Sequence, residues 1–132
     1  DLKISEQVDF VGAVDNSQVP DHINKMDIFV VPSRIESFGV AAIEALACER
    51  PCIVANTGGL PEVINDKRTG VVAEYESIKS LVGSLIEVIE NQQHSIEMGV
   101  EGRKDVLNKY SQQAAVSTMS DLYLRFYDRK NI

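Results

Sequence analysis

The chain has 132 residues and a formal net charge of −7, and 44% of its residues are hydrophobic. This length favours one domain, and the acidic balance offers no broad basic surface for a nucleic-acid partner. No apolar run reaches the ~18 residues of a membrane-spanning helix, and the first residues lack the pattern of a signal peptide. The composition is that of a globular domain with one hydrophobic core.

The two cysteines, Cys48 and Cys52, lie in apolar surroundings and are not spaced as C-x-x-C. No histidine or further cysteine clusters near them, which argues against a metal site. We expect two buried free thiols in a reducing compartment, and hence a cytoplasmic protein.

The first half of the chain alternates between expected strands and helices. Continuous apolar runs such as "IFVV" are typical of strands that are buried on both faces of a parallel sheet. The expected strands are Val8–Val11, Ile28–Val31, Cys52–Ala55 and a short one within "TGVVAE". The expected helices between them are Ser17–Met26, Phe38–Glu49 and one or two turns in "LPEVIND". This order predicts an α/β fold whose parallel sheet carries helices on both faces.

From Ser77 onward the pattern is helical only. Apolar residues recur at helical spacing, which predicts an all-helical C-terminal tail. The expected helices are Ser77–Asn91, Ile96–Lys109 and Ser111–Arg129.

Three polar or glycine-containing loops follow the expected strands: "GAVDNS", "PSRIESFG" and "NTGG". If the strands are parallel, the three loops lie along one rim of the sheet, where such folds bind their ligands. The second loop leads into a helix near Phe38 and Gly39, whose free amides favour an anion. That argument is weak alone, because every helix has such an end, and no phosphate-binding glycine motif is present.

Glu44 is the one charged residue between Phe38 and Cys48. Its helical neighbours are small or apolar, so we expect a helix that is buried all round, with a hydrogen-bond donor for this carboxylate. Glu36 precedes Glu44 by eight residues, about 12 Å along a helix axis, which suits the two ends of an extended ligand. Two alternatives stay open: Glu44 could bond a local amide, and Glu36 could be a solvated loop residue.

"NTGGLPE" is open to the same two interpretations. Gly58 and Gly59 could allow a left-handed backbone conformation before a helix that has Pro61 in its first turn. Alternatively, they could expose their amides to a ligand. Glu62 suits the first turn of that helix. The residues alone favour the structural interpretation.

The stretch from Asp27 to Val72 resembles the C-terminal, donor-binding half of retaining glycosyltransferases of the GT-B fold, family 4 (group 1) type. Glu36 and Glu44 match the two acids of that family's E-x(7)-E motif. The contexts "PS…ESFG", "EALA", "PCIVA", "GGLPE" and "TGVV" match in order and spacing. The resemblance extends over nearly the whole chain, including "VDFVG" and the helical tail.

The resemblance implies a Rossmann-like sheet, a nucleotide-diphosphate sugar as donor, transfer with retention, and no metal or cofactor. It implies a catalytic role for Glu36 at the donor sugar and hydrogen bonds from the ribose hydroxyls to Glu44. The backbone at Ser37, Phe38, Gly39 and Val40 would face the sugar and diphosphate. Val14 would lie near the base, and Thr57, Gly58 and Gly59 would line the donor side.

The resemblance also implies a protein of which residues 1–132 form a partial C-terminal nucleotide-sugar-binding domain. The N-terminal acceptor domain, the first part of this domain and its diphosphate-binding cations would precede Asp1. We therefore expect uncovered apolar surface on the first strand and the last helix, and we interpret Arg34 as a surface residue. The implied enzyme would serve polysaccharide biosynthesis in the cytoplasm, with peripheral attachment to the inner membrane face as a further expectation.

A non-catalytic sugar-nucleotide-binding or regulatory module is the alternative to the transferase. A third class, a receiver domain of the flavodoxin-like type, would need an acidic cluster at the end of the first strand and a lysine at the end of a late one, and the sequence has neither. The base, the donor sugar and the acceptor are not identified by these residues.

Overall fold

The computed structural model describes the backbone of residues 3–130 and the side chains of residues 3–127. Its centre is a parallel sheet of order β1-β2-β3, formed by β1 (Phe29–Val31), β2 (Cys52–Ala55) and β3 (Gly70–Ala73). Val30 lies opposite Ile53, which lies opposite Val71. The parallel sheet and three of its four expected strands are confirmed.

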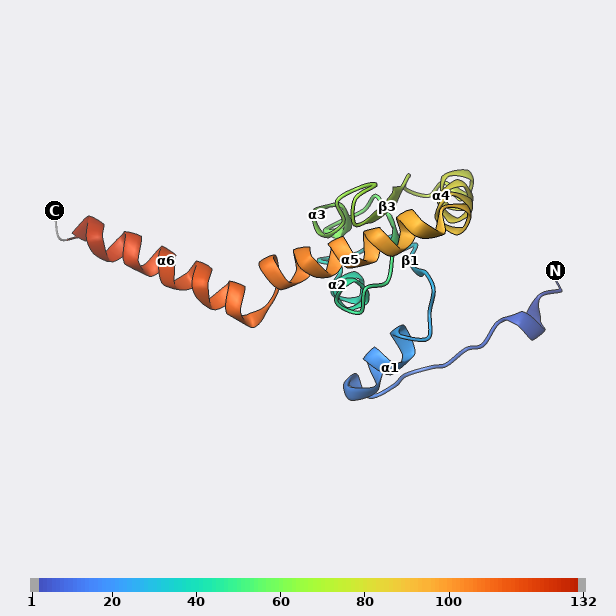
Figure 1. The fold of residues 1–132 in the computed structure, drawn as a ribbon, viewed down its shortest axis with the longest axis horizontal. Coiled ribbons are helices and arrows are strands. Elements are labelled where there is room, and N and C mark those ends of the chain that lie inside the picture. Colours follow the sequence, from blue (N-terminus) through green and yellow to red (C-terminus); the bar gives the residue numbers. More distant parts are fainter. Residues whose placement is uncertain (1–2, 131–132) are drawn as a thin grey trace.

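Helices connect and follow these strands, as expected (Figure 1). The structure ends several of them earlier than the sequence suggested, because loop residues take over the hydrogen bonds at their ends. The helices are α1 (Val19–Ile23), α2 (Val40–Ala47), α3 (Leu60–Val63), α4 (Ile78–Glu90), α5 (Gln92–Lys109) and α6 (Gln112–Lys130). Two 3₁₀ turns, Ser5–Gln7 and Asn16–Gln18, precede α1.

The two faces of β2 belong to two hydrophobic clusters. Cys52 and Val54 pack with residues of α2 and α3, such as Leu46. Ile53, on the opposite face, packs with Val88 of α4 and with Met98 of α5. This alternation follows from the two-residue period of a strand, and it confirms that helices cover both faces of the sheet.

Helix α5 packs against α2 at very short range through two glycines. A Cβ added at Gly99 would lie 2.1 Å from the carbonyl oxygen of Glu49, which follows α2. One added at Gly102 would lie 2.4 Å from Cδ2 of Leu46. No larger residue fits at either position, so the two glycines fix the position of α5 relative to α2.

The expected first strand is not formed. Residues Val8 to Val11 have extended backbone without a strand partner, and Figure 1 shows this segment running apart from the sheet. A strand needs a neighbour for its amides and carbonyls, and among the described residues β1 pairs only with β2. Phe10 is 95% exposed, so the uncovered apolar surface expected here is confirmed.

Helix α6 also carries uncovered apolar side chains. It extends away from the rest of the molecule in Figure 1, and Met119, Tyr123 and Phe126 are 52%, 68% and 56% exposed. The expected apolar stripe on the last helix is therefore confirmed as exposed surface. Across the described residues, no helix is long and apolar enough to cross a membrane.

Candidate nucleotide-sugar site

The loops that follow β1 and β2 pack against each other, backbone to backbone. A Cβ on Gly58 would lie 1.6 Å from the carbonyl oxygen of Glu36, and one on Gly59 would lie 2.8 Å from Cα of Phe38. The Thr57 hydroxyl donates a hydrogen bond to the carbonyl oxygen of Arg34, 3.2 Å away. Of the three loops expected along one rim, the two after β1 and β2 share it, whereas the first, "GAVDNS", follows no strand of the sheet, so that part of the expectation is wrong. Close backbone approach is the structural reason for the two adjacent glycines.

Glu36 closes the start of α2 with its own side chain. One carboxylate oxygen accepts hydrogen bonds from the amides of Phe38 and Gly39, at 3.2 Å and 3.1 Å. Gly39 is the helix N-cap with φ of +96°, a conformation that side-chain-bearing residues rarely adopt. Glu36 is half-buried, so the alternative of a freely solvated loop residue is wrong. The amides of Phe38 and Gly39 were expected to face an anion. In this structure the anion is the carboxylate of Glu36.

The expectation that α2 is buried all round is wrong. Ala42, Ala45 and Leu46 are fully buried, whereas Val40 is 58% exposed and Glu44 is also exposed. The helix packs against the sheet and α5 on one side only, and small side chains leave the other side open. Within residues 3–127 no hydrogen bond or ion pair from Glu44 is seen, so the argument from an unpaired buried charge does not apply. Its carboxylate faces open surface instead.

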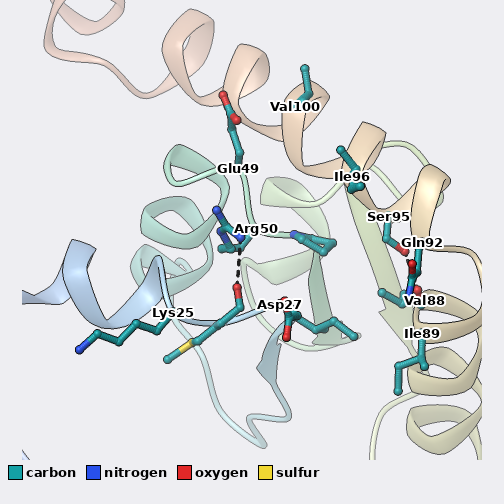
Figure 2. A pocket seen from close by; sticks show the side chains of 13 residues that line it. Lys25, Asp27, Glu49, Arg50, Val88, Ile89, Gln92, Ser95, Ile96 and Val100 are labelled. Atoms are coloured by element: carbon teal, nitrogen blue, oxygen red, sulfur yellow. Dashed lines mark hydrogen bonds between the residues drawn. The ribbon is translucent and has the colours of Figure 1, made fainter.

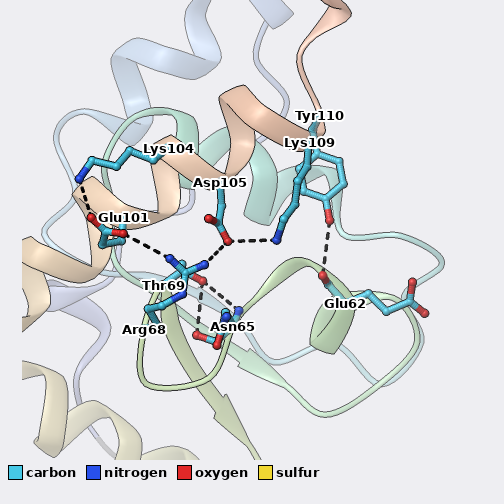
Figure 3. Close-up of polar contacts among 9 residues, drawn as sticks. All are labelled: Glu62, Asn65, Arg68, Thr69, Glu101, Lys104, Asp105, Lys109 and Tyr110. Atoms are coloured by element: carbon cyan, nitrogen blue, oxygen red, sulfur yellow. Dashed lines mark hydrogen bonds and ion pairs between the residues drawn. The ribbon is translucent and has the colours of Figure 1, made fainter. Parts of the chain in front are cut away.

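Phe38 is held from a distant part of the sequence. Its ring meets the ring of Tyr110 edge to face, with centroids 5.8 Å apart and an interplanar angle of 82°. The Tyr110 hydroxyl in turn donates to the carbonyl oxygen of Glu62 in α3, at 3.4 Å (Figure 3). Such ring pairs have a preferred geometry, so Tyr110 ties the loop after β1 and helix α3 to the end of α5. Nothing in the sequence singled this tyrosine out.

The remaining predicted site residues are distributed as follows. Ser37 and Phe38 are exposed in the Glu36 loop. Gly39 is buried as the N-cap of α2, and Val40 is the exposed first residue of that helix. Val14 is half-buried just before the turn Asn16–Gln18. The structure brings together the predicted residues of the two loops. Glu44 lies one turn along α2, and Val14 lies in the segment that precedes α1.

Three cations of the loops before and after the strands, Arg34, Lys67 and Arg68, are each paired with carboxylates. Arg34 pairs with Glu76 at 3.2 Å, and Lys67 pairs with Glu87. Arg68 pairs with Glu101 at 3.3 Å and with Asp105, and it links the loop before β3 to α5 (Figure 3). Arg34, which is 82% exposed, is confirmed as a surface residue.

The Arg68 cluster is a structural ion-pair network. The hydrogen bond from Arg68, followed by that from Lys109, lowers the pKa of Asp105 against the opposing effect of burial. Lys104 holds the pKa of Glu101 below its usual value in the same way. Both carboxylates are thus committed to their partners on α5 and the loop before β3, away from the rim.

Among the described residues, no cluster of three His, Cys, Asp or Glu side chains could hold a metal ion. Cys48 and Cys52 are free thiols, half-buried and buried respectively. Burial raises the pKa of the Cys52 thiol to about 12, which makes it a poor nucleophile at neutral pH. The prediction of free thiols is confirmed, although Cys48 is only partly covered.

Two hollows lie at opposite ends of the sheet. One of about 860 Å³ lies at the amino ends of β1 and β2, between Ile28, Pro51 and the turn from α4 to α5 (Figure 2). Arg50 crosses it and donates to the carbonyl oxygen of Met26, 3.2 Å away. A smaller hollow of about 240 Å³ lies at the carboxyl ends, beside Arg34. The convergent amides and carboxylates are at the carboxyl ends, which is where ligands of parallel sheets bind, so we place the candidate site there.

The fold and this rim define an α/β domain with a ligand site at the carboxyl ends of a parallel sheet. The chain belongs to the family of group 1 glycosyl transferases, whose model matches residues 1–105. It is 27% identical over 128 residues to a GDP-mannose-dependent α-(1-6)-phosphatidylinositol monomannoside mannosyltransferase of Mycobacterium tuberculosis, covering 92% of this chain and 33% of that protein.

Solved structures agree on the fold. The sucrose-phosphate synthase of Thermosynechococcus elongatus superposes with a TM-score of 0.84 at 27% identity, over 96% of this chain and 32% of that one. The Anabaena protein HepE, solved in complex with UDP-glucose, superposes with a TM-score of 0.79 at 22% identity, over 90% and 34%. The GT-B assignment is confirmed. The chain spans about a third of the length of the curated relatives it matches.

Proposed function

We propose that this chain is the donor-binding part of a retaining glycosyltransferase that takes a sugar from a nucleotide-diphosphate sugar and passes it to an acceptor. One observation carries the proposal: the amides of Phe38 and Gly39 converge on a single anionic oxygen at the carboxyl ends of the sheet. Backbone donors arranged in this way favour negative charge, and a sugar diphosphate supplies it.

The two motif acids take different roles in this proposal. Glu44 accepts hydrogen bonds from ribose hydroxyls, and its exposed carboxylate, which has no partner among the described residues, is available for them. Glu36 contacts the donor sugar, and its place beside the amides puts it at the end of the ligand where the diphosphate meets the sugar. The relative named for GDP-mannose and the structure solved with UDP-glucose favour a sugar nucleotide as the class of donor, with no choice of base.

A non-catalytic sugar-nucleotide-binding module remains the alternative, and one observation favours it. Arg34, the one cation in the two loops at the rim, is paired with the carboxylate of Glu76. Stabilising a departing diphosphate needs positioned positive charge. The transferase therefore requires cations from sequence outside these residues, whereas a binding module does not.

Titration calorimetry tests the shared part of both ideas. The 132-residue chain is titrated with UDP, GDP, UDP-glucose and GDP-mannose. Saturable binding of at least one at a single site is expected, and absence of binding by all four contradicts the proposal. Glycosyl transfer by the full-length enzyme then separates a transferase from a binding module.

A further inference from the structure

Two amides at the start of α2 have a partner that a bound anion would remove. The amides of Phe38 and Gly39 donate to one carboxylate oxygen of Glu36, at 3.2 Å and 3.1 Å. A diphosphate that takes this position displaces the carboxylate, and the bonds that now orient the loop are exchanged for bonds to the ligand. The amides keep their direction during this exchange only if other contacts hold Phe38.

Backbone contacts hold this loop on the side of α3. A Cβ added at Gly59 would lie 2.8 Å from Cα of Phe38, and one added at Gly39 would lie 2.9 Å from Cδ2 of Leu60. This close packing limits how far the loop can move toward α3. It involves the backbone of Phe38 and leaves the side chain, which is 47% exposed, to be held by other residues.

The ring of Tyr110 contacts the Phe38 side chain. The two rings meet edge to face, with centroids 5.8 Å apart and an interplanar angle of 82°. This geometry places the positive edge of one ring against the negative face of the other, so the pair resists rotation as well as separation. Phe38 carries one of the two amides and directly precedes the residue that carries the other. A restraint on its side chain is therefore a restraint on both amides.

Tyr110 is itself fixed between two helices. Its amide donates to the carbonyl oxygen of Val106 at 2.8 Å, which extends the hydrogen bonding of α5 by one residue. Ser111, the next residue, caps α6 by accepting from the Ala114 amide at 3.1 Å. The half-buried Tyr110 side chain also packs against the hydrophobic cluster on the α2 side of the sheet. The ring that supports Phe38 thus has a firm base.

The Tyr110 hydroxyl contributes less than the ring. It donates to the carbonyl oxygen of Glu62 at 3.4 Å (Figure 3). Hydroxyl donors usually lie about 2.7–2.8 Å from their acceptors, so this bond is weak. Removing the ring should therefore loosen Phe38, whereas removing the hydroxyl alone should not.

We propose that Tyr110 is a positioning residue for the diphosphate of the donor. Its ring holds Phe38 so that the amides of Phe38 and Gly39 keep their direction when the Glu36 carboxylate is displaced. The assignment to a diphosphate rests on the proposed function, whereas the restraint on the two amides rests on the contacts described here. The other interpretation is that Tyr110 serves only the stability of the core.

Calorimetry on the 132-residue chain separates the two interpretations, with UDP, UMP, GDP and GMP as ligands. The amides are assigned to the sugar side of the diphosphate, which a monophosphate lacks. Tyr110→Leu keeps an apolar side chain but removes the ring. It should weaken the diphosphate that binds by about three- to tenfold, the scale of one oriented ring pair, and the matching monophosphate by less than about twofold.

Two further variants serve as controls. Tyr110→Phe, which removes only the hydroxyl, should keep the affinity for the diphosphate, as should Tyr123→Leu, the same change at an exposed position of α6. A residue that acts only on stability lowers the folded fraction and weakens both ligands by the same factor. Equal losses for diphosphate and monophosphate in Tyr110→Leu would therefore overturn the proposal, as would an equal loss in Tyr110→Phe.

Solvent-exchange rates of the amides, measured by nuclear magnetic resonance on the ligand-free chain, test the restraint without a nucleotide. The Phe38 and Gly39 amides should exchange at least about threefold faster in Tyr110→Leu than in Tyr110→Phe, because their bonds to Glu36 open more often, and the amides of β2 should not change. Equal rates at Phe38 and Gly39 overturn the proposal. If neither diphosphate binds the unmodified chain, the proposed function is refuted, and the exchange rates alone decide on the restraint.

Discussion

The carboxylate of Glu36 accepts a hydrogen bond from the Gly39 amide at 3.1 Å and so occupies the position that an anionic ligand would take. The same side chain is therefore a cap for α2 when the site is empty and a candidate sugar contact when it is filled. A bound diphosphate that approaches these amides has to displace it. This dual role gives Glu36 two separable effects, on stability and on turnover.

Replacing Glu36 tests both effects. Glu36→Ala should lower the free energy of unfolding by about 1 kcal/mol, the usual scale of a lost cap, whereas Glu36→Gln keeps an acceptor oxygen and should cost less. Chemical denaturation measures this. In the full-length enzyme, Glu36→Ala should lower turnover with intact sugar nucleotide and barely change the affinity for the free nucleoside diphosphate. Equal losses in both assays would contradict the sugar-end assignment.

Glu44 should contribute to binding and not to folding. Glu44→Gln is expected to weaken donor nucleotide binding by about 1.5–3 kcal/mol, because a charge-assisted acceptor for the ribose is lost. Its exposed side chain has no partner in the described residues, so the melting temperature should not change. Calorimetry and thermal unfolding measure the two quantities, with Glu90→Gln as the matched control. Unchanged nucleotide affinity would refute the role.

Gly58 and Gly83 form a matched pair for the packing of the two site loops. Gly58→Ala should destabilise the fold by about 3–5 kcal/mol, because its Cβ would lie 1.6 Å from the carbonyl oxygen of Glu36 at a φ of +51°. Gly83 lies within α4 with open space around it, so Gly83→Ala should stabilise by about 0.5–1 kcal/mol. Urea denaturation measures the free energy of unfolding of both variants. A similar change in this free energy for the two would show that the loops do not pack as described.

Asp105 should make stability depend on pH at the acid end. Its pKa is lower in the folded chain because Arg68 and Lys109 stabilise the charged form. This contribution is therefore present above the unfolded value of about 3.9 and is lost as pH falls through the folded pKa. Asp105→Asn should cost about 1 kcal/mol near pH 7 and nothing once the carboxyl is protonated. Denaturation curves across this range, with Asp121→Asn as control, test the difference; a pH-independent cost would argue against the ion pairs.

Residues 1–132 alone should not catalyse sugar transfer. Catalysis needs an acceptor held against the reacting carbon and cations on the leaving diphosphate. Neither Lys67 nor Arg68 supplies the positive charge at the diphosphate, because both side chains are paired with carboxylates away from the rim. Purified chain is incubated with sugar nucleotide and a panel of glycoside acceptors, and products are followed by mass spectrometry. Measurable transfer would refute this expectation.

The strands that the sequence predicted well are those whose partners are close in the chain. β2 has the predicted bounds, because Cys52–Ala55 is buried on both faces and paired on both edges. Val8–Val11 also contains residues of high strand propensity but has no strand partner among the described residues, and local propensity alone does not make a strand. Glu44 shows the opposite failure: a run of small residues suggested burial, whereas α2 is covered on one side only.

The positions of the site residues depended on contacts that a sequence pattern does not contain. The sequence predicted that the two loops lie side by side, because both follow parallel strands whose carboxyl ends lie at the same edge of the sheet. The pairing of Phe38 with Tyr110, 72 positions later, was not predictable, because one aromatic residue at the end of a long helix carries no signal of its partner. The pairing of Arg34 with Glu76 was missed for the same reason.

The glycine contacts between α5 and α2 couple the position of α5 to the candidate site. Gly99 and Gly102 set its distance from α2, and Tyr110, directly after its last residue, supports Phe38. From residue 99 to residue 110 a helix advances about 16 Å, and a rigid helix displaced at one end shifts the other. An alanine at Gly99, far from any ligand, would thus tilt the support of the α2 start. A shift of α5 at this contact would reach Phe38 through Tyr110, although neither glycine belongs to the site itself.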